Sequence, residues 1–237
     1  MMSRSLTIVA AWAGLLFVAV LLAAFLLMGF LPPISPALDA EGVASIYAEN
    51  RTRILIGASL TMQSAFLSIL WVGAIASQIR RMGFAEARLL ADAQMLLGVF
   101  GAVLFTITAT AWTVAAYRVD RSPELIMMLN DFAWLFLLTP VFQFLLQSFL
   151  IGIAILADRR EQPLFPRWAA YLNFWVGLAL LPGAINPLFK QGPFAWDGVF
   201  IFWLPLVAFA AWIVVMAWLV ARAAQIPDEV DRQASSA

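Results

Sequence analysis

Long apolar runs restrict the fold of this chain more than any other feature. Six of them follow one another, each about 20 residues long, the length of helix that crosses about 30 Å of hydrocarbon. Lipid offers no water to the backbone N–H and C=O groups, so only helices and closed barrels can span it. The runs are continuous and do not alternate between polar and apolar residues, which argues against a barrel. The sequence therefore predicts an all-α, polytopic transmembrane bundle with six spans.

The predicted bundle is a single transmembrane domain over residues 1–226. The six spans are expected at residues 6–30, 54–79, 89–116, 132–157, 168–185 and 199–221. Beyond them, the polar residues 227–237 predict a disordered tail, because they contain too little apolar surface to order a segment.

Two serine–proline pairs predict further helix starts. A serine caps the first free N–H groups of a helix, and a proline fits its first turn. Ser35 and Pro36 therefore predict a short helix over residues 36–50, lying in the membrane interface. Ser122 and Pro123 predict a helix that runs on into the fourth span.

Composition agrees with a chain surrounded by a lipid bilayer. The sequence is 64% hydrophobic and 12% charged, with a mean hydropathy of +0.92. A soluble domain is about half apolar and about a quarter charged. Formal net charge is zero, so no strong field attracts nucleic acid, and nucleic acid is not expected as a partner.

Six spans place both termini on one side of the membrane, and the basic residues indicate which side. Nine of the 14 lysines and arginines fall on the side of the termini, and five fall on the other. Cytoplasmic loops carry the excess of positive charge. We therefore expect both termini in the cytoplasm, in a multi-pass protein of the bacterial cytoplasmic (inner) membrane.

Absent residue types exclude several kinds of chemistry for this chain alone. It has no cysteine and no histidine, which excludes thiolate nucleophiles, haem held by histidine, copper sites and histidine-based acid–base catalysis. The single lysine, Lys190, falls in a predicted loop, so no Schiff base is available inside the bundle. No cofactor, no metal site and no enzymatic activity are expected.

The fourth span carries polar side chains where hydrocarbon is expected. Asp131, Thr139, Gln143 and Gln147 share one ridge of the predicted helix. An unpaired amide in hydrocarbon is costly, so Gln143 and Gln147 must face protein or a cavity. Two interpretations follow: hydrogen bonds to hydroxyl groups of the second and third spans, or contacts to a ligand. Asp131 is either an outer-interface residue reached by water and by Arg118 or Arg121, or a carboxylate that orients a ligand.

Three more residues complete the set of candidate ligand contacts. Gln63 in the second span and Asn173 in the fifth are the natural amide partners for the fourth span. Arg53, with Glu49 before it, is either an anion-orienting pair at the mouth of the second span or a solvated surface pair.

Four short stretches carry a resemblance to a known group of proteins. They are RSPE at 121–124, LNDFAW at 129–134, FPRW at 165–168 and GPFAW at 192–196. Together they make the second half of the chain similar to a set of bacterial six-helix integral membrane proteins of unassigned function. The resemblance implies a six-helix fold and no particular activity.

Three functions remain open on the sequence. The first is a non-catalytic membrane protein, either an accessory or structural subunit of a membrane assembly or a binder of an apolar small molecule between its helices. The alternative is a small-solute transporter with a polar cavity lined by amides of the second, fourth and fifth spans. A membrane enzyme ranks third, because Asp131 and Arg53 form no nucleophile–base pair.

Overall fold

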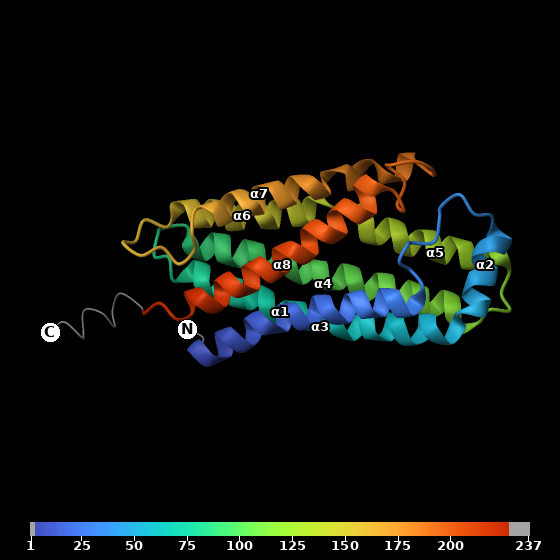
Figure 1. Ribbon diagram of the computed structural model, residues 1–237, viewed down its shortest axis with the longest axis horizontal. Coiled ribbons are helices and arrows are strands. Elements are labelled where there is room, and N and C mark those ends of the chain that lie inside the picture. The colour runs from blue at the N-terminus through green and yellow to red at the C-terminus, as the bar shows by residue number, and fades with distance from the viewer. Residues whose placement is uncertain (1–2, 228–237) are drawn as a thin grey trace.

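The protein folds entirely into helices in the computed structural model, which describes residues 3–227 (Figure 1). The elements are α1 (Arg4–Met28), α2 (Ala40–Glu49), α3 (Arg51–Arg80), α4 (Ala87–Tyr117), α5 (Pro123–Leu138), α6 (Phe142–Ala157), α7 (Trp168–Leu180), a 3₁₀ helix (Leu181–Leu188), a π-helical turn (Val199–Trp203) and α8 (Leu204–Ala223). Within residues 3–227 the chain forms no strand, which confirms the predicted all-α class.

Six helical segments are long and apolar enough to cross a membrane, as predicted. α1, α3 and α4 each form one, α5 and α6 form the fourth together, and the last two contain α7 and α8. α1 begins and α8 ends at the same end of the bundle, and α2 covers the opposite end (Figure 1). The large side chains on the outside are themselves apolar, as a surface facing hydrocarbon requires; examples are Val9, Phe66, Leu96, Leu146, Trp175 and Val207.

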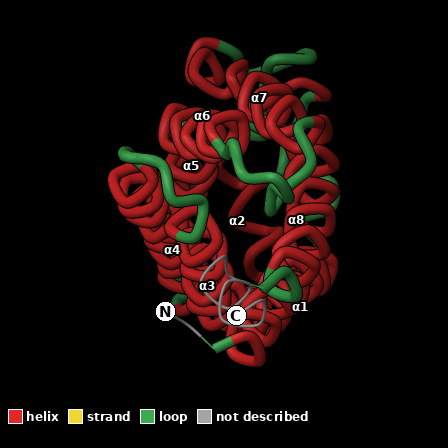
Figure 2. The backbone as a smooth tube through the Cα atoms, turned by 90° about the vertical axis from the view of Figure 1, so that its left-hand side faces the viewer, coloured by secondary structure: helices red, strands yellow, loops and turns green. Residues whose placement is uncertain are grey.

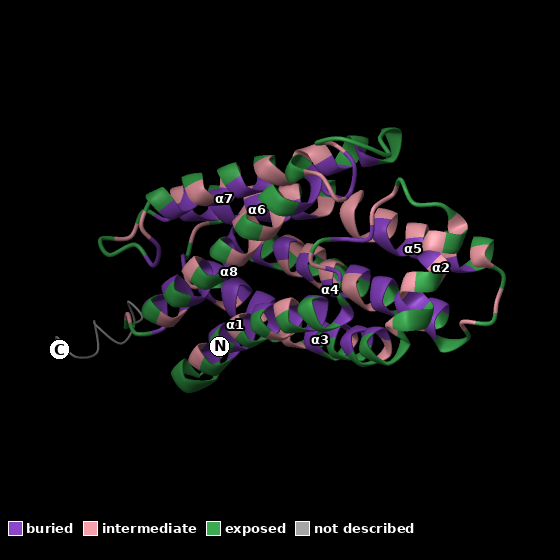
Figure 3. Ribbon diagram, turned by 45° about the vertical axis from the view of Figure 1, so that its right-hand side comes forward, coloured by how far each residue is buried: buried purple, intermediate pink, exposed green. Residues whose placement is uncertain are grey.

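The six segments close into a ring. Seen end-on, α3 and α1 lie below, α4 and α8 on opposite sides, and α6 and α7 above (Figure 2). Each neighbouring pair around this ring is in contact, in the order α1, α3, α4, α6, α7, α8 and back to α1. Buried positions face the inside of the ring and exposed positions face outward (Figure 3). The centre of the ring is therefore the place where all six segments can contribute side chains to one site.

Large aromatic side chains fill the half of the ring nearest α2. Trp112 of α4 and Trp134 of α5 meet edge to face with ring centroids 5.1 Å apart, and both are fully buried. Phe30 packs on both of them and on Tyr47 of α2. Phe25 of α1 packs on Trp112 and Trp134 as well, so aromatic contacts join α1, α4 and α5 in this half of the bundle.

Several helices begin or end a few residues away from the predicted positions. The first helix stops at Met28, because Gly29 adopts a left-handed conformation (φ 75°) that caps it. The short helix predicted over residues 36–50 begins at Ala40, with Asp39 as its cap in place of Ser35. α3 begins at Arg51, three residues earlier than expected, directly after α2. Of the predicted tail, all but Pro227 falls outside the described residues.

The fourth span is interrupted, in contrast to the predicted continuous helix. α5 ends at Leu138 and α6 begins at Phe142. Pro140, between them, has no N–H, so the carbonyl of Phe136 loses its i+4 donor. The fifth span is irregular as well. α7 ends at Leu180 and a 3₁₀ helix continues to Leu188, beyond the predicted residue 185.

Candidate functional site

A cavity of about 170 Å³ lies at the centre of the ring, and all six membrane-length segments line it. Its lining is mainly apolar. One residue from each segment illustrates this arrangement: Phe17 (α1), Trp71 (α3), Gly101 (α4), Gln147 (α6), Leu180 (α7) and Trp212 (α8). The site is therefore a product of the whole bundle and not of one helix.

Aromatic rings in mutual contact form one wall of this cavity. Trp212 lies edge to face with Trp71 at 4.7 Å between ring centroids and with Phe144 at 4.9 Å. The ring centroids of Phe144 and Phe209 lie 5.3 Å apart, and those of Phe17 and Phe105 lie 5.4 Å apart. Offset and edge-to-face pairs are the favoured aromatic arrangements, so the wall is well packed and suited to a further ring.

Irregular backbone surrounds the same cavity. Pro140 and Val141, at the interruption of the fourth span, both line it. So does Leu180, where α7 passes into the 3₁₀ helix, and so do Phe202 and Pro205 at the start of the sixth span. Non-helical backbone at membrane depth is tolerated only where it is buried in protein or lines a cavity. Interrupted helices around a central site are also typical of transporters.

Gln143 joins α6 to α4 beside the cavity. Its Nε2 donates to the backbone carbonyl of Leu97 at 2.7 Å and also to Oε1 of Gln147 at 3.3 Å. The sequence predicted hydroxyl partners from the second and third spans for these amides. This prediction is wrong, because no hydroxyl accepts from Gln143 in the hydrogen bonds above. Thr61 of α3, for example, donates its hydroxyl to the carbonyl of Gly57 in its own helix. The partner across the helices is a main-chain carbonyl.

Gln147 is a buried amide whose N–H donor has no partner among the described residues. It is 3% exposed and lines the cavity, and its Nε2 has no hydrogen-bond partner among the described residues. A Cβ added to Gly98 of α4 would lie 2.6 Å from this nitrogen, so only glycine lets the amide approach α4 this closely. A buried donor without an acceptor costs about 1–3 kcal/mol.

The other polar side chains of the cavity either form hydrogen bonds or pack against a neighbouring helix. Ser68 donates its hydroxyl to the carbonyl of Ala65 at 2.6 Å. Trp212 donates its Nε1 to Oδ1 of Asn173 at 2.9 Å. Trp71 Nε1 has no partner among the described residues, but its pyrrole edge packs against Gly14 of α1. Nε2 of Gln147 is therefore buried against α4 and has no partner among the described residues.

Asn173 is buried, as its position in the fifth span requires, yet it does not line the cavity. Its Nδ2 donates to the carbonyl of Ala169 at 2.7 Å, and its Oδ1 accepts from Trp212. It therefore joins α7 to α8 and reaches the cavity only through the Trp212 ring, which it orients.

Gln63 and Arg53 lie away from this site. Both side chains are exposed on α3, so neither pairs with the amides of the fourth span. It is Arg51, two residues before Arg53, that joins α3 to the end of α4, by donating to the carbonyl of Tyr117 at 3.1 Å. Of the six predicted contacts, the structure brings together only Gln143 and Gln147 at the cavity.

Asp131 belongs to a second polar group, at the end of the bundle covered by α2. Tyr47 of α2 donates to Oδ1 of Asn130 at 3.2 Å, and Asn130 donates to Asp131 at 3.4 Å. Burial and then the charge of Asp131 raise the pKa of Tyr47, which keeps its hydroxyl protonated as a donor. The hydrogen-bond partner of Asp131 is Asn130, while the expected Arg118 and Arg121 make other contacts.

Arg118 and Arg121 have other contacts. Arg118 lies over the ring of Tyr117, and Arg121 donates to the carbonyl of Val114 at 2.7 Å. The sequence interpretation missed Asn130, which is fully buried and links α5 to α2. The signal that could have found it is the turn spacing from Asn130 to the buried Trp134, which puts both on the inner face of α5.

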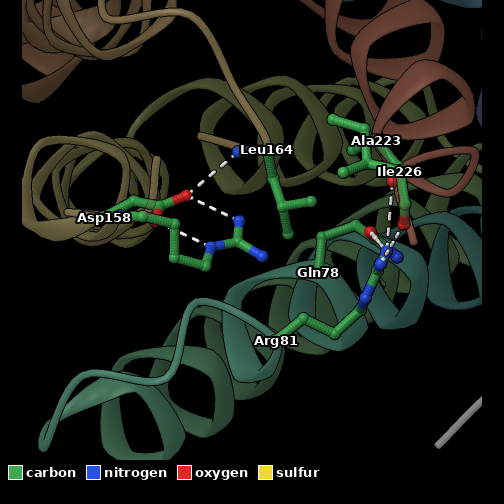
Figure 4. A network of polar contacts seen from close by, with 7 residues as sticks. Gln78, Arg81, Asp158, Leu164, Ala223 and Ile226 are labelled. Atoms are coloured by element: carbon green, nitrogen blue, oxygen red, sulfur yellow. Dashed lines mark hydrogen bonds and ion pairs between the residues drawn. The ribbon is translucent and has the colours of Figure 1, made fainter. Parts of the chain in front are cut away.

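A third polar group closes the end of the bundle where α8 ends (Figure 4). Arg81 at the end of α3 donates to Oε1 of Gln78 at 2.7 Å and to the carbonyl of Ala223 at 3.1 Å, and it also donates to the carbonyl of Ile226. Arginine side chains near the C-terminus of a helix can donate to its last carbonyls, as Arg81 does here at Ala223. This contact fixes the ends of α3 and α8 to each other.

Asp158, just after α6, is 3% exposed and fully paired (Figure 4). Its carboxylate accepts from Arg160 Nε at 2.9 Å and Nη2 at 2.7 Å, and from the Leu164 amide at 3.0 Å. Burial alone would raise the pKa of Asp158, but the hydrogen bonds from Arg160 and Leu164 outweigh it and hold the pKa below its usual value. The sequence interpretation did not single out this pair, which orders the loop before α7.

Within residues 3–227, no three histidine, cysteine, aspartate or glutamate side chains gather in a group that could hold a metal ion. The central cavity offers amide, hydroxyl and indole groups on apolar walls, an arrangement suited to binding by hydrogen bonds and apolar contact. In comparisons with known proteins, no family model, no curated protein and no solved structure matches this chain.

Proposed function

We propose that the protein binds a small lipophilic molecule in its central cavity. The observation that carries this proposal is a cavity of about 170 Å³ lined by all six membrane-length segments, with aromatic rings along one wall. Ligand sites are typically concave, mostly apolar and furnished with a few polar groups. Gln143, Gln147 and Ser68 are the polar groups here.

The size of the cavity indicates a ligand part of about one ring. An engineered apolar cavity of about 150 Å³ binds benzene. A cavity of about 170 Å³ therefore admits a six-membered ring with a small substituent. Phe144, Phe209 and Trp212 would contact the ring at their edges or faces, the geometry that aromatic pairs favour.

A cavity-filling variant tests this proposal. Leu206→Trp places a large ring in the cavity, and Leu146→Trp makes the same change at a position that is 51% exposed and outside the cavity lining. The purified proteins are heated with and without toluene, because a ligand that binds only the folded state raises its stability. We expect toluene to stabilise the wild type and Leu146→Trp but not Leu206→Trp. Equal stabilisation of all three, or of none, would exclude specific binding in the cavity.

Organic extraction of the purified protein supplies a second readout. A molecule that copurifies in stoichiometric amount with wild type and Leu146→Trp, and is lost from Leu206→Trp, identifies the natural ligand by mass spectrometry. The comparison is made at equal detergent content, since detergent micelles also dissolve lipophiles.

A carrier is the second candidate, favoured by the interrupted helices around the cavity. The fourth and sixth spans depart from α-helix where they line it, at Pro140 and Phe202, and the fifth lines it at Leu180, the last residue before its 3₁₀ helix. Of the amides predicted to line a transport path, Gln143 and Gln147 line the cavity, whereas Gln63 and Asn173 do not. A Gln143→Leu, Gln147→Leu double variant in liposomes should lose flux of any carried solute, and unchanged flux would count against a carrier.

We further propose that both termini are cytoplasmic, in a multi-pass protein of the bacterial inner membrane. The support is the distribution of arginine and lysine in the sequence: nine of 14 fall in the termini and in the loops predicted on the same side as the termini. An accessory role in a membrane assembly is a separate proposal that rests on composition. Its test is whether a stoichiometric second chain comes down in mild detergent.

A further inference from the structure

We infer that the molecule in the central cavity donates a hydrogen bond to Oε1 of Gln143, and that it is a neutral, ring-sized lipophile with a hydroxyl or N–H group. This inference rests on the proposed function, namely that the cavity holds a lipophile, and it names the chemical class of that lipophile. Two observations carry it. The side-chain donors of the lining are used or fully buried, and Oε1 of Gln143 has no partner among the described residues.

Two hydrogen bonds hold the Gln143 amide in one orientation. The carbonyl of Leu97 can only accept, so the atom of Gln143 that lies 2.7 Å from it is the nitrogen. The same nitrogen donates to Oε1 of Gln147 at 3.3 Å, which uses the second of its two hydrogens. The amide oxygen of Gln143 is therefore the end that is left without a partner.

This oxygen differs from the unpaired nitrogen of Gln147 in that it is not fully buried. Nε2 of Gln147 has almost no accessible surface, whereas Oε1 of Gln143 does not belong to the fully buried polar atoms that lack a partner. Gln143 is partly exposed and lines the cavity. A Cβ added to Gly101 of α4, which also lines the cavity, would lie 3.9 Å from this oxygen. The donor of the ligand is therefore placed beside Gly101.

The other polar side chains of the lining offer a ligand acceptors and no accessible donor. Ser68 donates its hydroxyl to a main-chain carbonyl, and Trp212 donates to Asn173. The nitrogens of Trp71 and Gln147 are fully buried. The oxygens of Ser68 and Gln147 can each accept a further bond. Main-chain groups at the interruption of the fourth span favour neither class, because the end of α5 leaves carbonyls and the start of α6 leaves N–H groups.

The mainly apolar lining favours a neutral donor over a charged one. None of the described residues that line the cavity is acidic, so an ammonium group would be buried without a counter-charge. A phenol or a small alcohol avoids that cost. Its ring would pack on the aromatic wall at Phe144, Phe209 and Trp212, while its hydroxyl would donate to Gln143. A hydrocarbon of the same shape would leave Oε1 unpaired.

The probes 4-fluorophenol and 4-fluorotoluene test this class, because they have nearly the same shape and differ by a hydroxyl against a methyl group. The affinities of both are measured for wild type, Gln143→Met and Gln94→Met in the same detergent. Partition of the probes into detergent is the same for all three proteins, so it cancels when their preferences are compared. We expect Gln143→Met to reduce the preference for 4-fluorophenol about fivefold, the worth of one net hydrogen bond.

Gln94 supplies the matched control. It is a fully buried glutamine of α4 outside the cavity lining, and its Nε2 donates to the carbonyl of Val72 in α3 at 3.3 Å. Gln94→Met therefore also loses a hydrogen bond between helices but leaves the acceptor at the cavity in place. Its preference for 4-fluorophenol should equal that of the wild type. An equal fall in both variants would assign the effect to loosened packing and overturn the inference.

Fluorine NMR gives a readout in the wild type that needs no substitution at Gln143. The fluorine resonance of bound 4-fluorophenol should move from its position in detergent alone towards its position when the probe donates to dimethylacetamide in an apolar solvent. Bound 4-fluorotoluene should show no corresponding change. This measurement decides the question where Gln143→Met does not fold.

The outcomes separate the two proposals. If both probes bind the wild type, but Gln143→Met keeps the wild-type preference or the fluorine resonance does not move, the donor class is overturned and the cavity remains a binding site. If neither probe binds the wild type, the proposed function fails and the donor class fails with it. A preference for 4-fluorophenol that falls only in Gln143→Met, together with the expected fluorine shift, supports both.

Discussion

The side-chain nitrogen of Gln143 lies 2.7 Å from the backbone carbonyl oxygen of Leu97, and this bond joins α6 to α4 beside the central cavity. The same nitrogen also donates to Oε1 of Gln147 at 3.3 Å, so this contact fixes how the Gln147 amide is turned. Of the two interpretations that the sequence left open for these amides, an interhelical hydrogen bond is the one that Gln143 makes. Nε2 of Gln147 has no partner among the described residues.

Loss of the contact at Gln143 should destabilise the bundle. Gln143→Leu leaves the carbonyl of Leu97 without its partner across the helices, and we expect a loss of about 1–2 kcal/mol in the free energy of unfolding, the usual worth of a polar contact between membrane helices. Denaturation in mixed detergent measures it. Gln63→Leu is the control, since that side chain is exposed, and it should change stability little. Equal losses in the two variants would contradict the interhelical role.

The pair of Asn173 and Trp212 should behave as one unit. Asn173→Leu leaves the buried Nε1 of Trp212 without an acceptor, which costs about 1–3 kcal/mol. Trp212→Phe removes the donor, so adding Asn173→Leu to it should cost clearly less than it does in the wild type. A double-mutant cycle on unfolding free energies measures this coupling. Additive losses would show that the hydrogen bond contributes nothing of its own.

Gly98 is required for the close approach of α4 and the Gln147 amide. In Gly98→Ala the new Cβ would lie 2.6 Å from Gln147 Nε2 and from a methyl carbon of Val72, so we expect a loss of about 1–3 kcal/mol through overpacking. The matched control is Gly73→Ala in α3, where nothing lies within 4 Å of the added Cβ. That change should be neutral or stabilise by up to about 1 kcal/mol, because alanine favours helix more than glycine does. Thermal unfolding should therefore show a loss of stability in Gly98→Ala and none in Gly73→Ala.

Acid should weaken the end of the bundle that holds Asp158. Because its hydrogen bonds hold the pKa of Asp158 below the ordinary 3.8, the unfolded chain binds a proton more readily than the folded one as the pH falls. The contribution of this carboxylate is therefore complete above the ordinary value and is lost as the pH drops through the lowered one. Asp158→Asn should be less stable than wild type at pH 6, and the gap should narrow below about pH 4. A gap that stays constant with pH would contradict the assignment.

Single cysteines can test the proposed orientation, because the chain has none of its own. Ser122→Cys lies in the loop between α4 and α5, and Glu161→Cys lies in the loop between α6 and α7, at the other end of the bundle; both positions are exposed. With the termini in the cytoplasm, a membrane-impermeant maleimide should label Ser122→Cys in whole cells. It should reach Glu161→Cys only after the membrane is opened. The reverse pattern would place the termini outside.

The sequence predicted the number of membrane-length helices because the apolar runs are long and well separated. It could not predict the interruption in the fourth span, since Pro140 permits either a kink or a break and the neighbouring segments decide between them. Packing of Gly183 directly against the carbonyl of Leu138 is one such contact, and it joins residues far apart in the sequence.

The ridge of Gln143 and Gln147 was predicted, but their partner was not. Every residue has a backbone carbonyl, so no side-chain type marks Leu97 as the acceptor. The outward position of Gln63, by contrast, follows from helix geometry. Thr61, Ser64 and Ser68 are buried on one face of α3, and a residue next to Ser64 points about 100° away from it.

Crystals soaked in bromobenzene test the central claim most directly, since anomalous scattering locates the bromine atom without reference to any variant. A ring of this size fits a cavity of about 170 Å³. The account predicts an anomalous peak inside the ring of helices, between Gln147 and Trp212, that is absent from crystals of Leu206→Trp. Peaks confined to the outer, lipid-facing surface, with none at the centre of the bundle, would contradict it.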